Sequence, residues 1–251
     1  QIVKYLPKER QTIMFSATMP TKIQQLAKTI LHDPVEVKLA VSKPAEKIIQ
    51  AAYICYEAQK LGIIQSLFQS QQPERVIIFA SSKLKVKEVT KALKRMKLNV
   101  GEMHSDLEQS QREEIMHEFR NRRIDILMAT DIVARGIDID DIRLVINYDV
   151  PHDSEDYVHR IGRTARANND GCAITFVSET EQTRFKQIET FLGKDIYKLP
   201  VPEELGEGPV YAPRTSRKKE QTGEEFLPQQ KGRMEKKGGN HSEKTGTKKN
   251  G

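Results

Sequence analysis

Cysteine and tryptophan are scarce in this chain, whose 251 residues include two cysteines and no tryptophan. Cys55 and Cys172 each lie in an apolar, strand-like run, and neither has the Cys-x-x-Cys or Cys/His spacing of a zinc site. This pattern argues against a disulfide framework and against a zinc module. Because thiols stay reduced in the cytosol, we expect two buried thiols in a cytoplasmic protein.

Long hydrophobic runs are also missing. Uninterrupted apolar runs such as VIIFA at 76–80 are far shorter than the ~20 residues that a membrane-spanning helix needs. The opening QIVKYLPKER has neither a first methionine nor the pattern of a signal peptide, so we read it as an internal part of a longer protein. We therefore expect no membrane contact.

Most of the chain lacks an excess of positive charge. Residues 208–251 hold 11 of the 41 Lys and Arg residues and 5 of the 35 Asp and Glu residues, which leaves 30 of each in residues 1–207. The formal net charge of +6 thus belongs to the C-terminal tail. Phosphate recognition in the neutral body must come from individually placed arginines rather than from a general positive field.

Short apolar runs alternate with amphipathic segments as far as residue 200, which predicts an α/β fold. A first series contains an expected strand at 12–15, a helix at 20–31 and a strand at 35–39. A second series contains strands at 48–56, 75–80, 99–103, 125–129, 143–148 and 172–177, with helices at 58–70, 84–96 and 108–120. Strands that are apolar on both sides predict a parallel sheet covered by helices on both faces.

Changes in composition divide the chain into four parts. Residues 1–39 hold the first series, the polar residues 40–47 would form a linker, and residues 48–204 hold the second series and would form the main domain. Beyond residue 205 the apolar residues give way to Gly, Lys, Glu, Gln, Thr and Ser. We expect residues 205–251 to be a disordered basic tail, because such a composition cannot bury enough surface to fold.

Polar clusters directly follow four of the expected strands, at 81–83, 104–112, 129–138 and 147–151. The carboxyl ends of parallel strands meet at one edge of a sheet, and open α/β sheets bind ligands there. The four clusters therefore favour a binding site at this edge.

A fifth cluster, HRIGRTAR at 159–166, places Arg160, Arg163 and Arg166 three residues apart. By itself this octet is equally typical of a solvated basic helix face. Its position in the chain leads us to expect the arginines after a parallel strand, at the same edge as the other clusters.

Six motifs occur in a fixed order between residues 10 and 200: SAT (16–18), VIIFASSK (76–83), HSDLEQSQR (104–112), ATDIVARGIDI (129–139), VINYDVP (145–151) and HRIGRTAR (159–166). In this order they resemble the second RecA-like domain of a DEAD-box RNA helicase, a fold related to P-loop NTPases. The HSDLEQ form and the basic tail are similar to bacterial RhlE-type members. The sequence departs from the family at Ser105 and Ala165, where glycine is usual.

No GxxxxGK[ST] phosphate loop and no Asp-Glu-Ala-Asp run occurs in the 251 residues. The resemblance therefore implies that residues 1–39 end a first RecA-like domain, which would carry the phosphate loop, the Mg²⁺ ligands and the water-activating acid. It implies that the full-length protein is a monomeric RNA helicase that hydrolyses ATP, and that this chain by itself does not hydrolyse ATP. A non-enzymatic RNA-binding module and a related DNA helicase remain as alternatives.

The resemblance also assigns residues to ATP. Arg163 and Arg166 would be arginine fingers at the γ-phosphate, where planar guanidinium groups suit the charge of the transferring phosphoryl group. Gly136 would let the backbone approach the nucleotide. Asp138 would accept a hydrogen bond from the ribose, with a turn or helix cap as the alternative.

The resemblance assigns a second set of residues to the coupling between the two domains. His159 would act with the fingers and contact Ser16 and Thr18 of the SAT motif. Arg160 would pair with Asp131, and a ligand contact is the alternative.

The resemblance implies that RNA would be held through its phosphates and 2′-hydroxyl groups rather than its bases, and the lack of an aromatic stacking platform fits this. The positions that match the family are Ser82, Gln109, Arg112, Thr130 and Arg135. A surface salt bridge is the alternative for Arg112, and Phe79 fits a core position. The basic tail would add salt-sensitive attraction to RNA or would only solubilise the protein.

Overall fold

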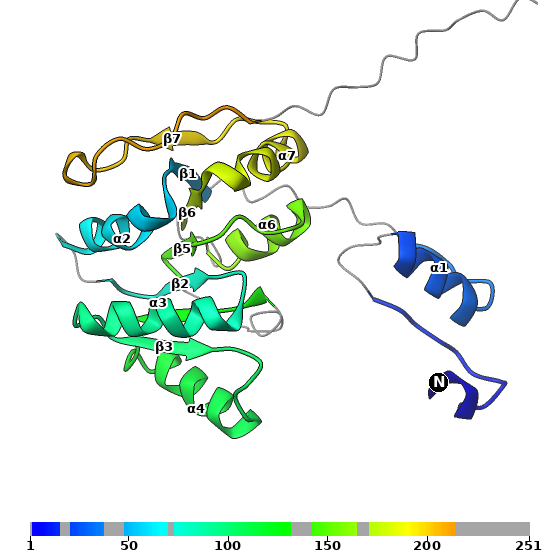
Figure 1. The fold of residues 1–251 in the computed structure, drawn as a ribbon. Coiled ribbons are helices and arrows are strands. Elements are labelled where there is room, and N and C mark those ends of the chain that lie inside the picture. Colours follow the sequence, from blue (N-terminus) through cyan, green and yellow to red (C-terminus); the bar gives the residue numbers. More distant parts are fainter. Residues whose placement is uncertain are drawn as a thin grey trace, which may run out of the picture. The chain divides into compact units, whose positions relative to one another are not determined.

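A computed structural model describes residues 2–15, 21–37, 48–69, 73–131, 142–164 and 171–213 (Figure 1). Contacts divide the chain into two units, Gln1–Thr215 and Ser216–Gly251. The second unit lies outside the described residues, as do the expected linker at 40–47 and the tail from residue 214.

The described residues form a sheet of seven parallel strands in the order β3-β4-β2-β5-β6-β1-β7. The strands are β1 (Ile48–Ile54), β2 (Val76–Phe79), β3 (Val100–Met103), β4 (Ile126–Ala129), β5 (Leu144–Asn147), β6 (Gly171–Val177) and β7 (Tyr197–Leu199). The six strands expected beyond residue 47 are confirmed. The short edge strand β7 was not expected from the sequence, because its side chains are half-buried to exposed and give no apolar run.

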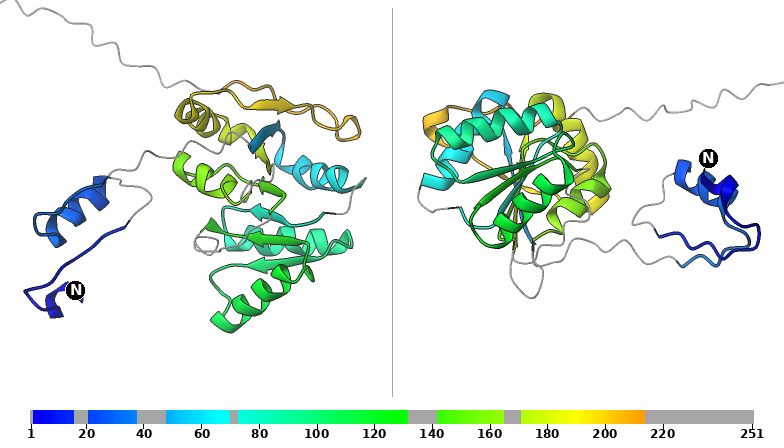
Figure 2. Two further views of the ribbon diagram at one scale, coloured as in Figure 1. Left: turned by 180° about the vertical axis from the view of Figure 1, so that it is seen from behind. Right: turned by 90° about the horizontal axis from the view of Figure 1, so that it is seen from below.

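Helices cover both faces of this sheet, as the right-hand view of Figure 2 shows. Successive strand residues point to opposite faces, so Ile77 and Phe79 of β2 join one core while Val76 and Ile78 join the other. The first core is completed by α4 (Gln109–Arg120), α6 (Ser154–Ile161) and α7 (Gln182–Leu192). The second is completed by α2 (Lys60–Gln69) and α3 (Lys83–Arg95). The expected parallel sheet between two helical layers is confirmed.

The N-terminal segment contains a 3₁₀ turn, Ile2–Tyr5, and the expected helix, α1 (Thr21–Ile30). The strands expected at 12–15 and 35–39 were wrong as far as the structure describes them, since residues 12–15 and 35–37 have no strand pairing. A strand needs a hydrogen-bonded neighbour, and none is available to these residues within the described ranges. Phe15 and Val35 accordingly remain 91% exposed.

The main domain continues beyond residue 204, so the expected start of the tail at 205 was too early. After the 3₁₀ turn Glu203–Leu205, the Gln59 side chain donates to the carbonyls of Leu205 and Glu207 at 2.9 and 3.1 Å. Gln182 in α7 donates to the Val210 carbonyl at 2.8 Å and accepts from the Ala212 amide at 2.7 Å. These long-range contacts, which composition cannot reveal, hold residues 205–212 on the domain.

Within the residues that the structure describes, no helix is long and apolar enough to cross a membrane. Cys55 is buried, and burial raises the pKa of its thiol to about 12. Cys172 is also a free thiol but is only partly buried.

Candidate functional site

The loop after β2 places Ser82 at the carboxyl edge of the sheet. Its extended backbone and its hydroxyl, which accepts the Lys85 amide at 3.2 Å, make Ser82 the N-cap of α3. The amide of the preceding Ser81 donates to the Asp149 carboxylate at 2.8 Å. The first turn of α3 is thus fixed from two sides, with Ser82 exposed at the edge.

The loop after β3 is tied to α3 by Asp106. The carboxylate of Asp106 accepts from Lys83 at 2.8 Å and from Lys87 at 2.9 Å. Hydrogen bonds from these two lysines lower the pKa of Asp106 to about 2. His104 is buried, and its Nδ1 accepts the Asp106 amide at 3.3 Å while its Nε2 is buried without a hydrogen-bond partner.

The first turn of α4 carries Gln109 and Arg112. Gln109 donates to Glu113 at 2.9 Å on the exposed side of the helix. Arg112 donates through Nη2 to the Ser105 carbonyl at 3.2 Å, and its Nε is buried without a partner. No carboxylate among the described residues pairs with Arg112, so the surface salt bridge considered as its alternative is not formed there.

Thr130 completes this edge, because it directly follows β4 and its amide donates to the Met103 carbonyl at the end of β3. Since β3, β4 and β2 are neighbours, the structure brings Ser82, Gln109, Arg112 and Thr130 to the ends of three adjacent strands. We call these four residues the strand-end set.

Arg160, in the last turn of α6, is buried and paired. Its Nε and Nη2 donate to the two carboxylate oxygens of Asp131 at 2.6 and 2.7 Å, and Nη1 donates to Asn147 and to the Asp149 carbonyl at 3.1 and 2.9 Å. The guanidinium also lies 5.2 Å from the ring centre of Phe79, a core residue of β2. All three nitrogens are used inside the domain, which is the geometry of a structural ion pair.

The rest of the octet lies elsewhere than expected. Arg163 follows α6 rather than a strand, and Thr164 forms a parallel bridge with Ile142, just before β5 begins. The expectation that these arginines share the carboxyl edge was wrong for Arg163, because α6 reverses the chain direction after β5. Arg163 is half-buried, and His159 is 36% exposed with its Nδ1 3.9 Å from Asp156.

A buried ionic cluster under the same edge was missed by the sequence analysis. Lys60 is fully buried, and its ammonium lies 2.7 Å from Glu57, 3.2 Å from Asp149 and 3.6 Å from Glu181. Lys85 reaches the same Asp149 oxygen and the other Glu57 oxygen, both at 2.9 Å. The cluster joins four segments that are far apart in the sequence, and Lys60 stands at the polar start of α2 beside Glu57 and Gln59, so no local pattern signals it.

Electrostatics keep this cluster charged. Burial alone would lower the pKa of Lys60, but the surrounding Glu181, Asp149 and Glu57 carboxylates outweigh it and raise that pKa. Burial alone would raise the pKa of Asp149, and Lys60 with hydrogen bonds from Lys85 and Ser81 lowers it instead. The attraction between its two ammonium groups and three carboxylates therefore fixes the first turn of α3 against the loop after β5.

The remaining candidates lie outside the described residues: Ser16, Thr18, Arg135, Gly136, Asp138 and Arg166. Among the described residues, no three His, Cys, Asp or Glu side chains gather as a metal site.

Comparison with known proteins places this architecture in a family. The model of the helicase conserved C-terminal domain matches residues 59–168, from α2 to the octet. The ATP-dependent RNA helicases CshA of Listeria monocytogenes and DbpA of Bacillus subtilis are each 37% identical, over 80% and 81% of this chain and 39% and 43% of their own lengths. The chain thus spans about two fifths of these curated relatives.

Solved structures give a fuller overlap. The Escherichia coli DEAD-box protein SrmB, bound to regulator of ribonuclease activity A, is 31% identical with a TM-score of 0.61, and the match covers 68% of this chain and 99% of that one. This chain belongs to the DEAD-box RNA helicase family. Dbp5 of Saccharomyces cerevisiae, bound to RNA and ADP BeF3, is 30% identical with a TM-score of 0.73, over 81% of this chain and 55% of that one.

Membership in the DEAD-box family confirms the resemblance read from the six motifs, together with the RecA-like fold. The likeness to RhlE-type members stays a prediction, since the relatives above are CshA and DbpA proteins. The residue roles also remain predictions.

Proposed function

We propose that this chain forms the C-terminal half of an ATP-dependent RNA helicase that unwinds RNA duplexes or remodels RNA–protein complexes. The observation that carries this proposal is the strand-end set, which presents four polar side chains at the ends of three adjacent strands. Named relatives that are ATP-dependent RNA helicases support the activity. We further propose that the protein works as a cytoplasmic monomer.

RNA would lie along this edge and contact it through phosphates and 2′-hydroxyl groups. The Ser82 and Thr130 hydroxyls and the Gln109 amide can each donate or accept, and Arg112 adds a permanent charge. The unpartnered Nε of Arg112 supports a phosphate ligand, because a buried donor without a partner is costly. Arg135 is proposed to extend the same surface.

ATP would be bound at a separate place, on the side of α6 from which Arg163 emerges. Arg163 and Arg166 are proposed to stabilise the charge on the transferring phosphoryl group, with His159 connecting them to Ser16 and Thr18. Gly136 and Asp138 are proposed to hold the nucleotide. Mg²⁺ would enter with ATP, and we propose that its protein ligands come from the first RecA-like domain.

Arg160 would couple these two places. Arg160 donates two hydrogen bonds to Asp131, which directly follows Thr130 of the strand-end set in the sequence. Arg163 lies three residues after Arg160. If RNA binding displaced Thr130, the buried Asp131–Arg160 ion pair would therefore transmit the displacement to Arg163. This arrangement supports ATP hydrolysis that depends on bound RNA.

The test is made on the full-length protein, with the Ser82→Ala, Arg112→Ala and Thr130→Val variants. Each variant should weaken binding of single-stranded RNA and raise the RNA concentration that half-saturates ATP hydrolysis. A Gln187→Ala variant on the exposed side of α7 serves as the control. RNA binding without any RNA-dependent ATP hydrolysis in the wild type would favour the non-enzymatic module, and equal stimulation by DNA of the same sequence would favour a DNA helicase.

A further inference from the structure

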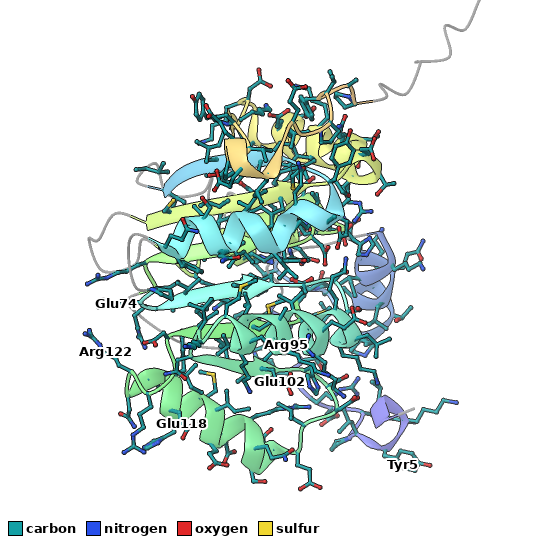
Figure 3. The ribbon with its side chains drawn as sticks, turned by 60° about the vertical axis from the view of Figure 1, so that its left-hand side comes forward. Tyr5, Glu74, Arg95, Glu102, Glu118 and Arg122 are labelled. Carbon is teal, nitrogen blue, oxygen red and sulfur yellow. The ribbon has the colours of Figure 1, made fainter. Side chains whose placement is uncertain are left out.

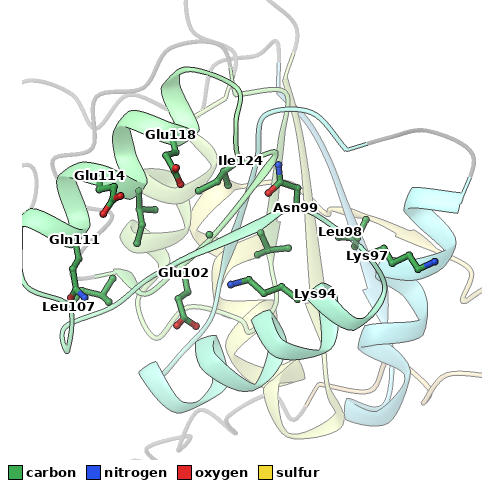
Figure 4. Close-up of a pocket in the computed structure, with 13 residues that line it drawn as sticks. Lys94, Lys97, Leu98, Asn99, Glu102, Leu107, Gln111, Glu114, Glu118 and Ile124 are labelled. Atoms are coloured by element: carbon green, nitrogen blue, oxygen red, sulfur yellow. The ribbon is translucent and has the colours of Figure 1, made fainter.

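A groove runs along the outer side of β3, at the edge of the sheet away from β7. Its volume is about 570 Å³, and its floor is the strand itself with Leu107, Ile115 and Ile124 beside it (Figure 4). The end of α3 forms one wall and α4 forms the other. Figure 3 shows the same edge from another side, with Glu102 on β3 and Glu118 on α4 labelled.

The backbone of β3 is open toward this groove. Within the part of the chain that the structure describes, β3 pairs only with β4. Asn99 and Met103 direct their carbonyls to β4, where they accept from the Ile126 and Thr130 amides. Because the pattern alternates along a parallel strand, the amides and carbonyls of Val100 and Glu102 face the groove. The groove therefore offers main-chain donors and acceptors in the register of a strand.

The two walls carry different charges. Glu114 and Glu118 project from α4, whereas Lys94 and Lys97 lie at the end of α3 (Figure 4). An added strand would alternate its side chains between these walls, since successive strand residues point to opposite faces. Side chains of the added strand that point toward α4 would meet the carboxylates of Glu114 and Glu118. Basic residues at every second position of that strand would therefore be favoured.

Two other occupants fit poorly. RNA phosphates would be repelled by Glu102, Glu114 and Glu118, which outnumber the two lysines. A second copy that pairs edge to edge about a two-fold axis would bring the acidic α4 walls of both copies to the same face of the joined sheet. Like charges would then oppose each other.

We propose that the β3 groove is a docking site for an extended segment of another protein, which adds as a strand to β3 and carries basic side chains at alternate positions. This inference does not rest on the proposed helicase activity. Recognition would combine main-chain hydrogen bonds to Val100 and Glu102 with charge pairing to Glu114 and Glu118. α4 also carries Gln109 and Arg112 in its first turn, so a docked segment would lie next to the strand-end set.

The test uses a fluorescein-labelled heptapeptide that alternates lysine and valine, with both ends blocked, and the full chain. Binding is followed by fluorescence anisotropy, and the site by amide NMR shifts. We expect the largest shifts at Val100 and Glu102. The double variant Glu114→Lys/Glu118→Lys should bind the peptide at least tenfold more weakly, while Glu88→Lys/Glu203→Lys, which makes the same charge change at two exposed positions outside the groove, should not.

Backbone methylation separates strand addition from simple charge attraction. Two further peptides carry N-methyl groups either on the lysine amides or on the valine amides, which leaves their charge unchanged. One of them should lose at least tenfold in affinity, because only alternate amides face β3. Equal binding by both would overturn the proposal, and so would full binding to the double variant. If removal of residues 214–251 raised peptide affinity tenfold, the basic tail of this chain would be the occupant, and the assignment to another protein would be wrong.

Discussion

Arg160 uses its whole guanidinium group inside the domain, bonding Asp131, Asn147 and the Asp149 carbonyl, and covering Phe79. We expect Arg160→Met to lower the free energy of unfolding by about 3–5 kcal/mol, because it leaves the Asp131 carboxylate without its partner charge. Urea denaturation of the chain measures this loss. Arg95→Met on the exposed end of α3 is the control and should stay within about 0.5 kcal/mol of wild type. A small loss at Arg160 would show that water replaces the ion pair.

Arg163 and Arg166 should behave in the opposite way. In the full-length protein, we expect Arg163→Ala and Arg166→Ala to abolish RNA-stimulated ATP hydrolysis while largely sparing stability and RNA affinity. An arginine finger acts on charge that develops in the transition state, so kcat should fall far more than KM rises. Lysine at position 166 should restore little, since an ammonium group lacks the planar fork.

Replacing Asp138 should have a different kinetic effect from replacing Arg163 or Arg166. A ribose contact is made equally in the ground state and the transition state, so Asp138→Ala should chiefly raise the KM for ATP. Steady-state ATPase kinetics at saturating RNA measure both effects, with thermal melts to verify folding. Near-normal kcat in a folded Arg166→Ala protein would contradict a role of Arg166 in hydrolysis.

At the level of secondary-structure elements, the Lys60 cluster joins the start of α2, the first turn of α3, the loop after β5 and the 3₁₀ turn Glu179–Glu181. Its carboxylates should make stability depend on pH. The pKa of Asp149 is lowered in the folded state, so its contribution is complete above its unfolded pKa of ~3.9 and is lost as the pH falls through the folded value.

We expect Asp149→Asn to lower the free energy of unfolding at pH 7 by up to about 3 kcal/mol, since Glu57 and Glu181 still face Lys60. The variant should also lose part of the stability change between about pH 5 and pH 2. Urea denaturation at several pH values measures both. The control is Asp106→Asn, whose ion pairs with Lys83 and Lys87 are exposed and screened by salt, so this variant should change the free energy of unfolding little. An unchanged pH profile in Asp149→Asn would contradict a charged Asp149 at the centre of the cluster.

The elements differ in how far the sequence could predict them. β2 and β4 were readable because their side chains are buried on both faces, which requires an unbroken apolar run. Residues 12–15 have a similar apolar pattern but no neighbouring strand among the described residues, and an apolar pattern alone does not specify a strand partner. At the site, the positions of the strand-end set could be predicted, because the carboxyl ends of parallel strands meet at one edge of the sheet. The position of Arg163 could not, because it depends on the length of α6. The contacts of Lys60 arise between distant segments and left little local trace.

At the scale of the whole molecule, charge and folded structure are separated along the chain. Residues 1–207 are neutral by formal charge, and the six residues 208–213 contain no charged side chain, so the net charge of +6 lies beyond residue 213. Residues 208–213 belong to the folded part, since Tyr211 packs edge-on against Phe185 and donates to Glu189 at 2.9 Å. A change in RNA binding after tail removal can therefore be assigned to the tail only if the truncation leaves residues 208–213 in place.

Two truncations should consequently differ. Removal of residues 214–251 should leave the free energy of unfolding unchanged, because it takes away only the basic segment. Removal of residues 208–251 should destabilise the domain by about 2–4 kcal/mol, since it uncovers Phe185, leaves the Gln182 side-chain amide without its partners and removes the Tyr211 hydrogen bond to the Glu189 carboxylate. Both proteins should bind single-stranded RNA more weakly at low salt. The slope of log K against log salt should fall by a few units at most, as expected when several phosphate contacts are lost. Urea denaturation and RNA titrations at several salt concentrations provide the two readouts. Equal stability of the two truncated proteins would show that residues 208–213 add nothing to the stability of the domain, and an unchanged salt slope would leave the tail as a solubilising segment without a part in RNA binding.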